Sequence, residues 1–474
     1  MARPARRPVV VLAALALVPA LALGGLVVFA RAQSPAESIA PPESSVPVTL
    51  PAALATPLLS ARRAPDALAD DRRRDLLLGS AAALAGSLDG SSCLVLGLDD
   101  RVVVNHNVDQ PLIPASNVKI ITAAVALEVL GPGHTFTTTV VGPTPVDGVI
   151  DGDVYVVGGG DPVLSERWYT EAAAGRKRPP FHVTDVNLLA DALAAAGVTR
   201  ISGRVLGDGS RYDDERFPPG WSDDIIASPD GAPVGALVIN DSYTSSGARG
   251  SEPTASAAAT FVALLAERGI EVDDGSGVAV APAGQAVLAS ITSAPLTSIL
   301  QEMLTTSDNL TAEMLVKEIG FVASQQGSRA SGLSVFLDRL TEWGVATAGV
   351  VFTDGSGLSR DNQLTCAALA AVLIRGSATD PLGAGLARGG QAGSTLVDSF
   401  TGAGLADVLQ GKTGTLSEVK SLSGYFMVGA DEVEFVLILN GASAADHQAR
   451  WDQLAAVLVA TASAPAADAL APAA

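Results

Sequence analysis

Aromatic residues, cysteines and histidines are all scarce in this chain. Aromatics make up 4% of its 474 residues, and there are two cysteines and four histidines. The histidines are scattered, and neither a Cys-x-x-Cys nor a His-Glu-x-x-His pattern occurs, so the usual metal-ligand spacings are missing. We therefore expect no metal site and no cofactor. Alanine, valine and leucine are abundant and can form a core without many aromatics.

The two cysteines, Cys93 and Cys366, lie far apart in the sequence. Cys93 belongs to the apolar run 93–96, which predicts a strand, and Cys366 begins an alanine-rich helical stretch. Exported proteins can carry disulfides, but two isolated cysteines do not make a disulfide framework. We expect both to be buried free thiols.

Positive charge is also in short supply. Lysine and arginine total 30 against 50 aspartates and glutamates, which gives a net charge of −20. Because binding to phosphates needs a basic surface, we expect no nucleic-acid partner. Attraction to anionic lipid headgroups through charge alone is disfavoured for the same reason. Only five of the basic residues are lysines, so a motif that contains lysine seldom arises here by chance.

Three short motifs stand in order along the chain: Ser116-Asn117-Val118-Lys119, then Ser307-Asp308-Asn309, then Lys412-Thr413-Gly414. The apolar run 120–127 follows the first motif and predicts a helix with the serine in its first turn. Ser417-Glu418-Val419-Lys420 also fits the Ser-x-x-Lys pattern, but it does not open an apolar helix. The order and flanks of the three motifs therefore make a stronger signal than any one of them.

The first motif predicts a nucleophile and its base. A serine hydroxyl attacks well only after a base removes its proton, and residues three apart on a helix share one face. We expect Ser116 to be the nucleophile and Lys119 the base. Lysine is a base only when neutral, so its pKa must fall through burial or a nearby positive charge, which Lys412 could supply. In the same cleft, Ser307 could relay a proton to the leaving group and Asn309 could hold a substrate carbonyl.

The third motif predicts substrate recognition. Lys412 and Thr413 suit a substrate carboxylate, and Gly414 would let the substrate come close to the strand. The backbone N–H groups of Thr415 and Ser116 could together form an oxyanion hole, in which losing one donor typically costs about 10²–10³ in rate.

The motif set and its flanks resemble the class C low-molecular-mass penicillin-binding proteins, the D-alanyl-D-alanine carboxypeptidase/endopeptidase family. The flanking segments that carry this resemblance are Gly158-Gly159-Gly160-Asp161-Pro162, Ile201-Ser202-Gly203-Arg204-Val205 with Asp208, Trp221 with Asp223-Asp224, and Asp354-Gly355-Ser356-Gly357-Leu358-Ser359-Arg360. One departure is Gly393-Ser394-Thr395-Leu396-Val397-Asp398, where the family usually has Gly-Thr-Leu followed soon by arginine. This departure weakens the match of the 385–400 region.

The resemblance implies an α/β fold: a serine transpeptidase/β-lactamase-like body with a β-rich domain inserted between the first and second motifs. It also implies a serine-type D-Ala-D-Ala carboxypeptidase that acts on peptidoglycan stem peptides through an acyl-enzyme on Ser116. β-Lactams would be covalent inhibitors at the same serine. Whether cross-links are cut as well stays open.

Two other functions remain as alternatives. A β-lactamase needs a dedicated carboxylate after the second motif for fast deacylation; Glu313 and Glu318 stand there, but on a predicted helix. A non-catalytic wall-binding protein on the same fold would be expected to have lost its nucleophile or base, and both are present here.

The N-terminal segment 1–32 predicts export. Arg3, Arg6 and Arg7 precede the apolar run 8–30, which is long enough to span a bilayer and would leave the remaining chain outside the cytoplasm. Ala30-Arg31-Ala32 resembles a cleavage site, so a retained signal anchor and a cleaved signal peptide both stay open. In either case this segment is the only part expected to contact the membrane.

We divide the remaining chain by composition and pattern. Residues 33–73 are a linker rich in proline, alanine and serine, 74–139 and 289–462 form the catalytic domain, 140–288 are inserted, and 463–474 are a disordered tail. The basic cluster Arg176-Lys177-Arg178 is expected on an exposed loop, with contact to an acidic wall polymer as the alternative. We predict helices over 76–88, 186–195, 255–268, 296–304, 311–322 and 450–460, and strands over 93–98, 102–105, 154–157, 204–206, 422–428 and 434–439.

Overall fold

The computed structural model describes residues 60–472, apart from 403 and 430, and these belong to one compact unit. The predicted signal segment 1–32 and most of the predicted linker lie outside the described residues. Within the described part of the chain, no helix combines the length and apolarity needed to cross a bilayer.

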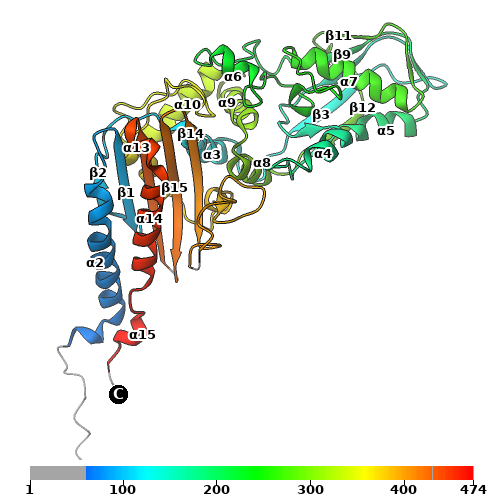
Figure 1. Ribbon diagram of the computed structural model, residues 1–474. Helices are drawn as coiled ribbons and strands as arrows, with labels where there is room; N and C mark the ends of the chain where they lie inside the picture. Colours follow the sequence, from blue (N-terminus) through cyan, green and yellow to red (C-terminus); the bar gives the residue numbers. More distant parts are fainter. Residues whose placement is uncertain (1–59, 403, 430, 473–474) are drawn as a thin grey trace, which may run out of the picture. The chain divides into compact units, whose positions relative to one another are not determined.

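A six-stranded antiparallel sheet forms the centre of the body (Figure 1). Its strands follow the order β13-β14-β15-β16-β1-β2, so β1 pairs with β16, the last strand of the chain, and β2 forms the edge beside β1. Their bounds are β1 Ser92–Leu98, β2 Arg101–His106, β13 Ala387–Arg388, β14 Leu409–Leu416, β15 Val419–Val428 and β16 Asp431–Asn440. The strands predicted over 93–98, 102–105, 422–428 and 434–439 are therefore confirmed.

Helices cover both faces of this sheet, because side chains alternate between the faces along each strand. Leu94 and Leu96 of β1 pack with α2 (Pro65–Gly86) and α14 (His447–Ala462) on one face. Cys93 and Val95 face the opposite core, which the remaining body helices form. Those helices are α3 Val118–Leu130, α8 Leu296–Glu302, α9 Asn309–Ser324, α10 Arg329–Glu342, α11 Cys366–Ile374 and α12 Pro381–Ala384.

Two predictions about the ends of the body are wrong. Helix α2 begins at Pro65, inside the predicted linker, and proline at the first helical position is favourable because its missing N–H would be unpaired there anyway. The tail predicted as disordered contains the short helix α15, Ala467–Leu470, which contacts α2. Figure 1 shows α2 and α14 side by side on one face of the sheet, with α15 near their ends.

The prediction of free thiols is also wrong. Cys93 and Cys366 form a disulfide that joins β1 to the first residue of α11 across a sequence separation of 273 residues. Both residues are fully buried. Local sequence pattern placed each cysteine in its element but could not show that the fold brings the two elements together.

The stretch between the first two motifs has sheets and a core of its own. It enters on β3 (Thr137–Gly142) and leaves on β12 (Ala286–Thr292), and these strands pair antiparallel, with Thr137 opposite Thr292. A five-stranded sheet has the order β11-β9-β5-β3-β12, a three-stranded one β10-β8-β4, and a two-stranded one β6-β7. The domain limits 140 and 288 stay a prediction.

Two long helices, α5 (Asn187–Ala195) and α7 (Pro253–Glu267), pack on the five-stranded sheet (Figure 1). The short helices are α4 Arg167–Ala173 and α6 Asp223–Ala227. The strands are β4 Val149–Ile150, β5 Val154–Val157, β6 Leu164–Ser165, β7 Thr184–Asp185, β8 Arg200–Ile201, β9 Val205–Asp208, β10 Glu271–Val272 and β11 Ser276–Val278.

Candidate active site

Ser116 lies in the turn that leads into α3, as the sequence predicted. A short 3₁₀ turn, Ala115–Asn117, precedes the helix. The backbone φ angle of Ala115 is 48°, a value that residues other than glycine rarely adopt. The Lys119 ammonium group is one turn further on, with Nζ 3.2 Å from Ser116 Oγ. The structure therefore brings these two residues of the first motif into contact.

Lys119 is fully buried and has two further partners. Its Nζ donates to Asn309 Oδ1 at 2.7 Å and to the backbone oxygen of Ser356 at 2.6 Å. A neutral amine has two N–H bonds and one lone pair. With both N–H bonds used by these acceptors, the lone pair is left for the longer contact with Ser116 Oγ. The arrangement suits a base that takes the serine proton.

Burial lowers the pKa of Lys119 to about 8, while the carboxylates of Asp308 and Asp354 act in the opposite direction. The sequence left two causes open, burial and the charge of Lys412, and burial is the main one. A group with a pKa of about 8 is partly neutral near physiological pH, which is the range in which a general base is most effective.

The second motif sits where a π-helical turn, Met303–Ser307, gives way to α9. Ser307 has a φ of 66°, and Asp308 caps α9 by accepting a 2.6 Å hydrogen bond from the N–H of Thr311. Asn309 is oriented from both ends: its Oδ1 accepts from Lys119, and its Nδ2 donates to the backbone oxygen of Asp230 at 3.2 Å. An amide held this way presents its N–H₂ group toward the cleft.

The third motif lies on β14, whose Lys412 is fully buried. Lys412 Nζ donates to Ser307 Oγ and to the backbone oxygen of Thr413, both at 2.8 Å. Burial, followed by the charges of Lys119 and Arg178, holds the pKa of Lys412 well below its usual range. The second and third motifs are thus joined directly, as are the first and second through Lys119 and Asn309.

Thr413 and Thr415 line the cleft beside Ser116, but Gly414 does not. A side-chain carbon at Gly414 would lie 2.2 Å from Ser421 Oγ and 2.8 Å from the backbone oxygen of Pro114. The sequence suggested that this glycine makes room for a substrate. The packing gives a different reason: the glycine lets β14 approach the turn before the nucleophile.

The loop 354–360, which the sequence placed near the cleft by resemblance, braces the base. The buried Asp354 carboxylate accepts hydrogen bonds from four donors: the N–H groups of Gly357 and Ser359 at 2.7 and 2.6 Å, Asn362 Nδ2 at 2.8 Å and Trp221 Nε1 at 2.9 Å. This carboxylate fixes the loop that offers the Ser356 carbonyl to Lys119. Trp221 comes from the inserted stretch, so the brace joins both parts of the chain.

Replacing Asp354 with alanine is expected to lower the free energy of unfolding by about 3–5 kcal/mol, because four buried donors lose their partner. The folded fraction should also acylate more slowly, since Ser356 is no longer held against Lys119. Asp361→Ala is the matched control, because Asp361 is an exposed carboxylate of the same segment with no side-chain hydrogen bond among the described residues. Urea unfolding with both variants checks this, and equal stability of the two would contradict it.

Several of the residues that line the cleft were not predicted from the sequence to lie there. The basic cluster is exposed on a loop, as expected, but no pattern in the sequence indicated that Lys177 and Arg178 line the cleft together with Ser116 and Ser307. The remaining lining residues are Asp230, Asn309, Leu358, Ser394, Thr395, Thr413 and Thr415. No local signal marks Asp230, because its position depends on a contact with Asn309, which is distant in sequence.

The two carboxylates considered for a β-lactamase are occupied elsewhere. Glu313 lies on α9 and accepts from the N–H groups of Gly355 and Ser356, the latter at 2.7 Å, and burial raises the pKa of Glu313 to about 8. Glu318 pairs with Arg211 and Tyr212. Neither lines the cleft, so neither is placed to activate a deacylating water.

One group of three carboxylates within the described residues could hold a cation. Oxygens of Asp100, Glu432 and Glu434 lie within 4.8 Å of one another, near the β1–β2 turn and the start of β16. None of the three lines the cleft. This group therefore lies outside the candidate active site.

Comparisons with known proteins agree with this geometry. The family described as D-Ala-D-Ala carboxypeptidase 3 (S13) matches residues 83–250 and 242–461. The chain is 29% identical to the D-alanyl-D-alanine carboxypeptidase of Actinomadura sp. (strain R39) over 456 residues, which covers 79% of this chain and 81% of that protein. It is 32% identical to carboxypeptidase Rv3627c of Mycobacterium tuberculosis over 339 residues, with 67% and 68% covered.

Among solved structures, penicillin binding protein 4 (dacB) from Haemophilus influenzae superposes with a TM-score of 0.67. The sequence identity is 19%, and the match covers 80% of this chain and 99% of that one. At this identity the likeness concerns the fold alone, and it confirms the predicted α/β fold class.

Proposed function

Because the chain belongs to the D-Ala-D-Ala carboxypeptidase 3 (S13) family, we propose that it is a serine-type D-Ala-D-Ala carboxypeptidase acting on peptidoglycan stem peptides. The observation that carries the proposal is the buried Lys119, whose Nζ lies 3.2 Å from Ser116 Oγ and 2.7 Å from Asn309 Oδ1. These contacts join a nucleophile, a base and a polar side chain of the second motif, which is what an acyl-enzyme mechanism requires.

In the first half of the reaction, Ser116 Oγ attacks the carbonyl carbon of the penultimate D-Ala as its proton passes to Lys119 Nζ. The N–H groups of Ser116 and Thr415 stabilise the oxyanion that forms. When the peptide bond breaks, the leaving amine of the terminal D-Ala needs a proton. Ser307 Oγ, which accepts a hydrogen bond from Lys412, would relay to this amine the proton that Lys119 took from Ser116, and Lys119 becomes neutral again.

In the second half, water attacks the ester on Ser116. Lys119 again accepts the proton, the shortened stem peptide leaves, and the serine hydroxyl is restored. β-Lactams would form the same ester with Ser116 and deacylate slowly, because Glu313 and Glu318 are committed to other contacts. Recognition of the substrate carboxylate is assigned to Thr413, with Lys412 behind it.

The family acts on the cell wall, so its members work outside the cytoplasm, and we propose the same location for this chain. The disulfide between Cys93 and Cys366 supports it, since such bonds persist in oxidising compartments. We also propose that residues 1–32 direct export, as a retained anchor or a cleaved signal.

Labelling with a fluorescent penicillin tests the proposal. We expect a stable adduct on the purified full-length chain, mapped by mass spectrometry to the peptide that holds Ser116, and release of D-Ala from an acyl-D-Ala-D-Ala peptide. Ser116→Ala should lose both, whereas Ser417→Ala, at the second Ser-x-x-Lys match in an exposed turn, should keep both. An intact parent with neither adduct nor D-Ala release would sink the proposal, and rapid loss of free penicillin would indicate a β-lactamase instead.

A further inference from the structure

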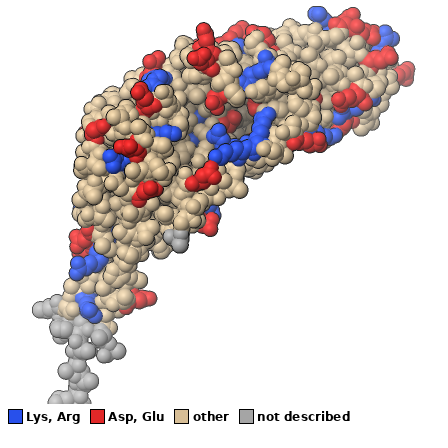
Figure 2. Space-filling view, viewed as in Figure 1, with Lys and Arg blue, Asp and Glu red and all other residues tan. Residues whose placement is uncertain are grey.

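The segment 166–183, which we call the cleft strap, contributes side chains to the cleft although it holds none of the three motifs. It comprises α4 and the loop that follows, with the basic cluster Arg176-Lys177-Arg178 at its tip. Lys177 and Arg178 are exposed and line the cleft beside Ser307 and Thr413. Figure 2 shows basic side chains gathered at a hollow in this face of the molecule.

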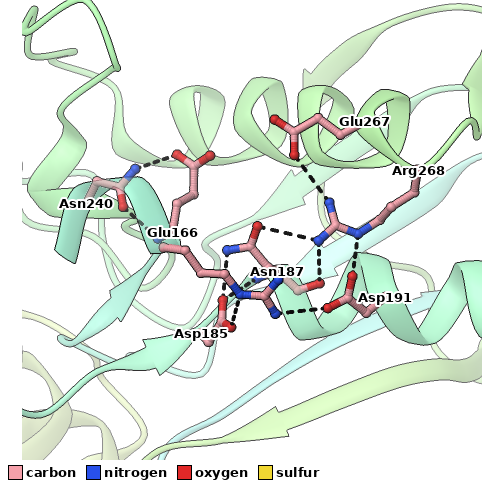
Figure 3. Close-up of polar contacts among 8 residues, drawn as sticks. Glu166, Asp185, Asn187, Asp191, Asn240, Glu267 and Arg268 are labelled. Atoms are coloured by element: carbon pink, nitrogen blue, oxygen red, sulfur yellow. Dashed lines mark hydrogen bonds and ion pairs between the residues drawn. The ribbon is translucent and has the colours of Figure 1, made fainter. Parts of the chain in front are cut away.

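The base of the strap is held by polar contacts within the inserted stretch. Glu166 and Asn240 bond reciprocally, with Asn240 Nδ2 2.6 Å from Glu166 Oε2 and the N–H of Glu166 2.8 Å from Asn240 Oδ1 (Figure 3). Arg167 bridges Asp185 at 2.8 Å and Asp191 at 3.0 Å. Glu166 and Arg167 both lie at the N-terminal end of α4, so these contacts fix the start of the strap to β7, α5 and the turn at Asn240.

The tip of the strap is fixed to the catalytic body. Arg178 Nη1 donates to the backbone oxygen of Thr306, immediately before Ser307, at 2.7 Å. Glu302 Oε2 accepts from the N–H groups of Phe181 and His182 at 3.0 and 2.5 Å. These contacts place the Arg178 guanidinium at the Ser307 end of the cleft.

Lys177 reaches the opposite wall of the same end. Its Nζ lies 2.7 Å from Asp398 Oδ2, and Asp398 follows the cleft residues Ser394 and Thr395 closely in sequence. Both partners are exposed, with side-chain exposures of 70% and 76%, so this ion pair is weak and open to exchange with another anion.

A carboxylate entering this end meets the strap before it meets Lys412. Lys412 is fully buried, and its ammonium group is already bonded to Ser307 and to the Thr413 carbonyl. Arg178 has five N–H donors, and within the described part of the chain the Thr306 carbonyl is its only hydrogen-bond acceptor. Its remaining donors can take a carboxylate in a charge-assisted hydrogen bond.

We propose that Lys177 and Arg178 form a second carboxylate subsite, at the leaving-group end of the cleft, that selects substrates with an anionic leaving group such as the free carboxylate of a terminal D-Ala. This inference rests on the proposed function and adds a specificity element outside the three motifs. The position beside Ser307 and Thr413 favours a small carboxylate within the cleft over an acidic polymer on the outer surface.

Two thioester substrates that differ only in leaving-group charge test the subsite: an N-acyl-D-alanyl thioglycolate and its methyl ester. The full-length chain is expected to prefer the anionic substrate in kcat/KM. Arg178→Gln, which retains a donor for the Thr306 carbonyl, should lower this preference about three- to tenfold, and Arg178→Lys should restore part of it. Asp398→Asn should raise the preference, because Lys177 loses its competing anion. The preference should also fall as salt is added.

Arg204→Gln is the control for net charge, since Arg204 is an exposed arginine of the inserted stretch that does not line the cleft. It should leave the preference unchanged. If the parent turns over both substrates but Arg178→Gln keeps the full preference, the subsite is refuted and Arg178 only fastens the strap. If an added polyanion inhibits the parent but not Arg178→Gln at unchanged preference, the strap binds a polymer and the proposal is likewise overturned. Failure of the parent on both substrates would count against the proposed function itself.

Discussion

Lys119→Met is expected to slow acylation of Ser116 by about 10³-fold or more, equivalent to about 4 kcal/mol of activation free energy. The variant keeps the volume of the side chain but removes the only amine within hydrogen-bonding distance of Ser116 Oγ among the described residues. It also frees the Asn309 amide from its orienting partner. Stopped-flow labelling with a fluorescent penicillin measures the acylation rate directly.

The pH dependence of acylation should identify the same group. Because the pKa of Lys119 is lowered to about 8 by burial, acylation by the parent should rise about tenfold per pH unit at low pH and level off above about 8. The acylation rate of Lys119→Met should not show this rise with pH. Lys119 and Lys412 influence each other, so the measured value is an apparent pKa of the pair.

Lys119→Met should affect the free energy of unfolding differently from the acylation rate. The native pKa of about 8 lies below the unfolded value of 10.5, so the protonated lysine costs the native state about 3 kcal/mol at neutral pH, and this cost disappears as the pH rises from about 8 to 10.5. Methionine removes the cost but leaves two acceptors unpaired. Because two unpaired buried acceptors cost a similar amount, we expect Lys119→Met to differ from the parent by no more than about 3 kcal/mol at pH 7.

Lys317→Met is the matched control. Lys317 is also nearly fully buried, but it pairs with Asp213 away from the cleft. This variant is expected to lose stability and to acylate within about threefold of the parent rate when folded. Comparable acylation by Lys119→Met and Lys317→Met would assign the base to another residue.

Replacing both Cys93 and Cys366 with alanine is expected to lower the free energy of unfolding by about 2–5 kcal/mol. The disulfide closes a loop of 273 residues, so its loss gives the unfolded chain many more conformations. It also releases β1 from α11 in the middle of the core that supports α3. Equilibrium unfolding in urea under non-reducing conditions gives the comparison.

The reducing agent dithiothreitol provides the control for this second prediction. It should destabilise the parent toward the level of the double variant and leave the double variant unchanged. Penicillin labelling of the folded double variant should stay near the parent rate, because neither cysteine lines the cleft. Equal stability of parent and double variant would mean that the bond does not form in the protein.

Local sequence patterns were enough to predict most of the strands and helices. The apolar runs of β1 and β16 predict strands, and their side chains are buried on both faces of the sheet. The pattern failed for the start of α2, because the linker assigned on proline, alanine and serine content was extended to residue 73. Arginine, alanine and leucine, which are frequent in α2, are good helix formers, and only Ala69, Leu77, Ala81 and Leu84 of this helix are buried.

In the candidate active site, too, local pattern predicted some residues and missed others. Ser116, Lys119 and Asn309 could be identified from the sequence because they belong to short motifs with recognisable spacing and chemistry. The four bonds to Asp354 and the contact of Arg178 with Thr306 could not, because each joins segments that only the folded chain brings together. Cys93 and Cys366 were missed for the same reason.

The pairing of β3 with β12 also has a meaning for how such enzymes diversify. Phe136 and Ser293 exchange hydrogen bonds of 2.9 and 3.0 Å where the inserted stretch leaves and rejoins the body. The chain therefore leaves and rejoins the body at one point, whereas further contacts such as those of Trp221 with Asp354 and of Asp230 with Asn309 hold the inserted stretch against the site. Since it brings Arg178 and Asp230 to the cleft, changes in the inserted stretch would alter the lining of the cleft while the three motifs stay in the body.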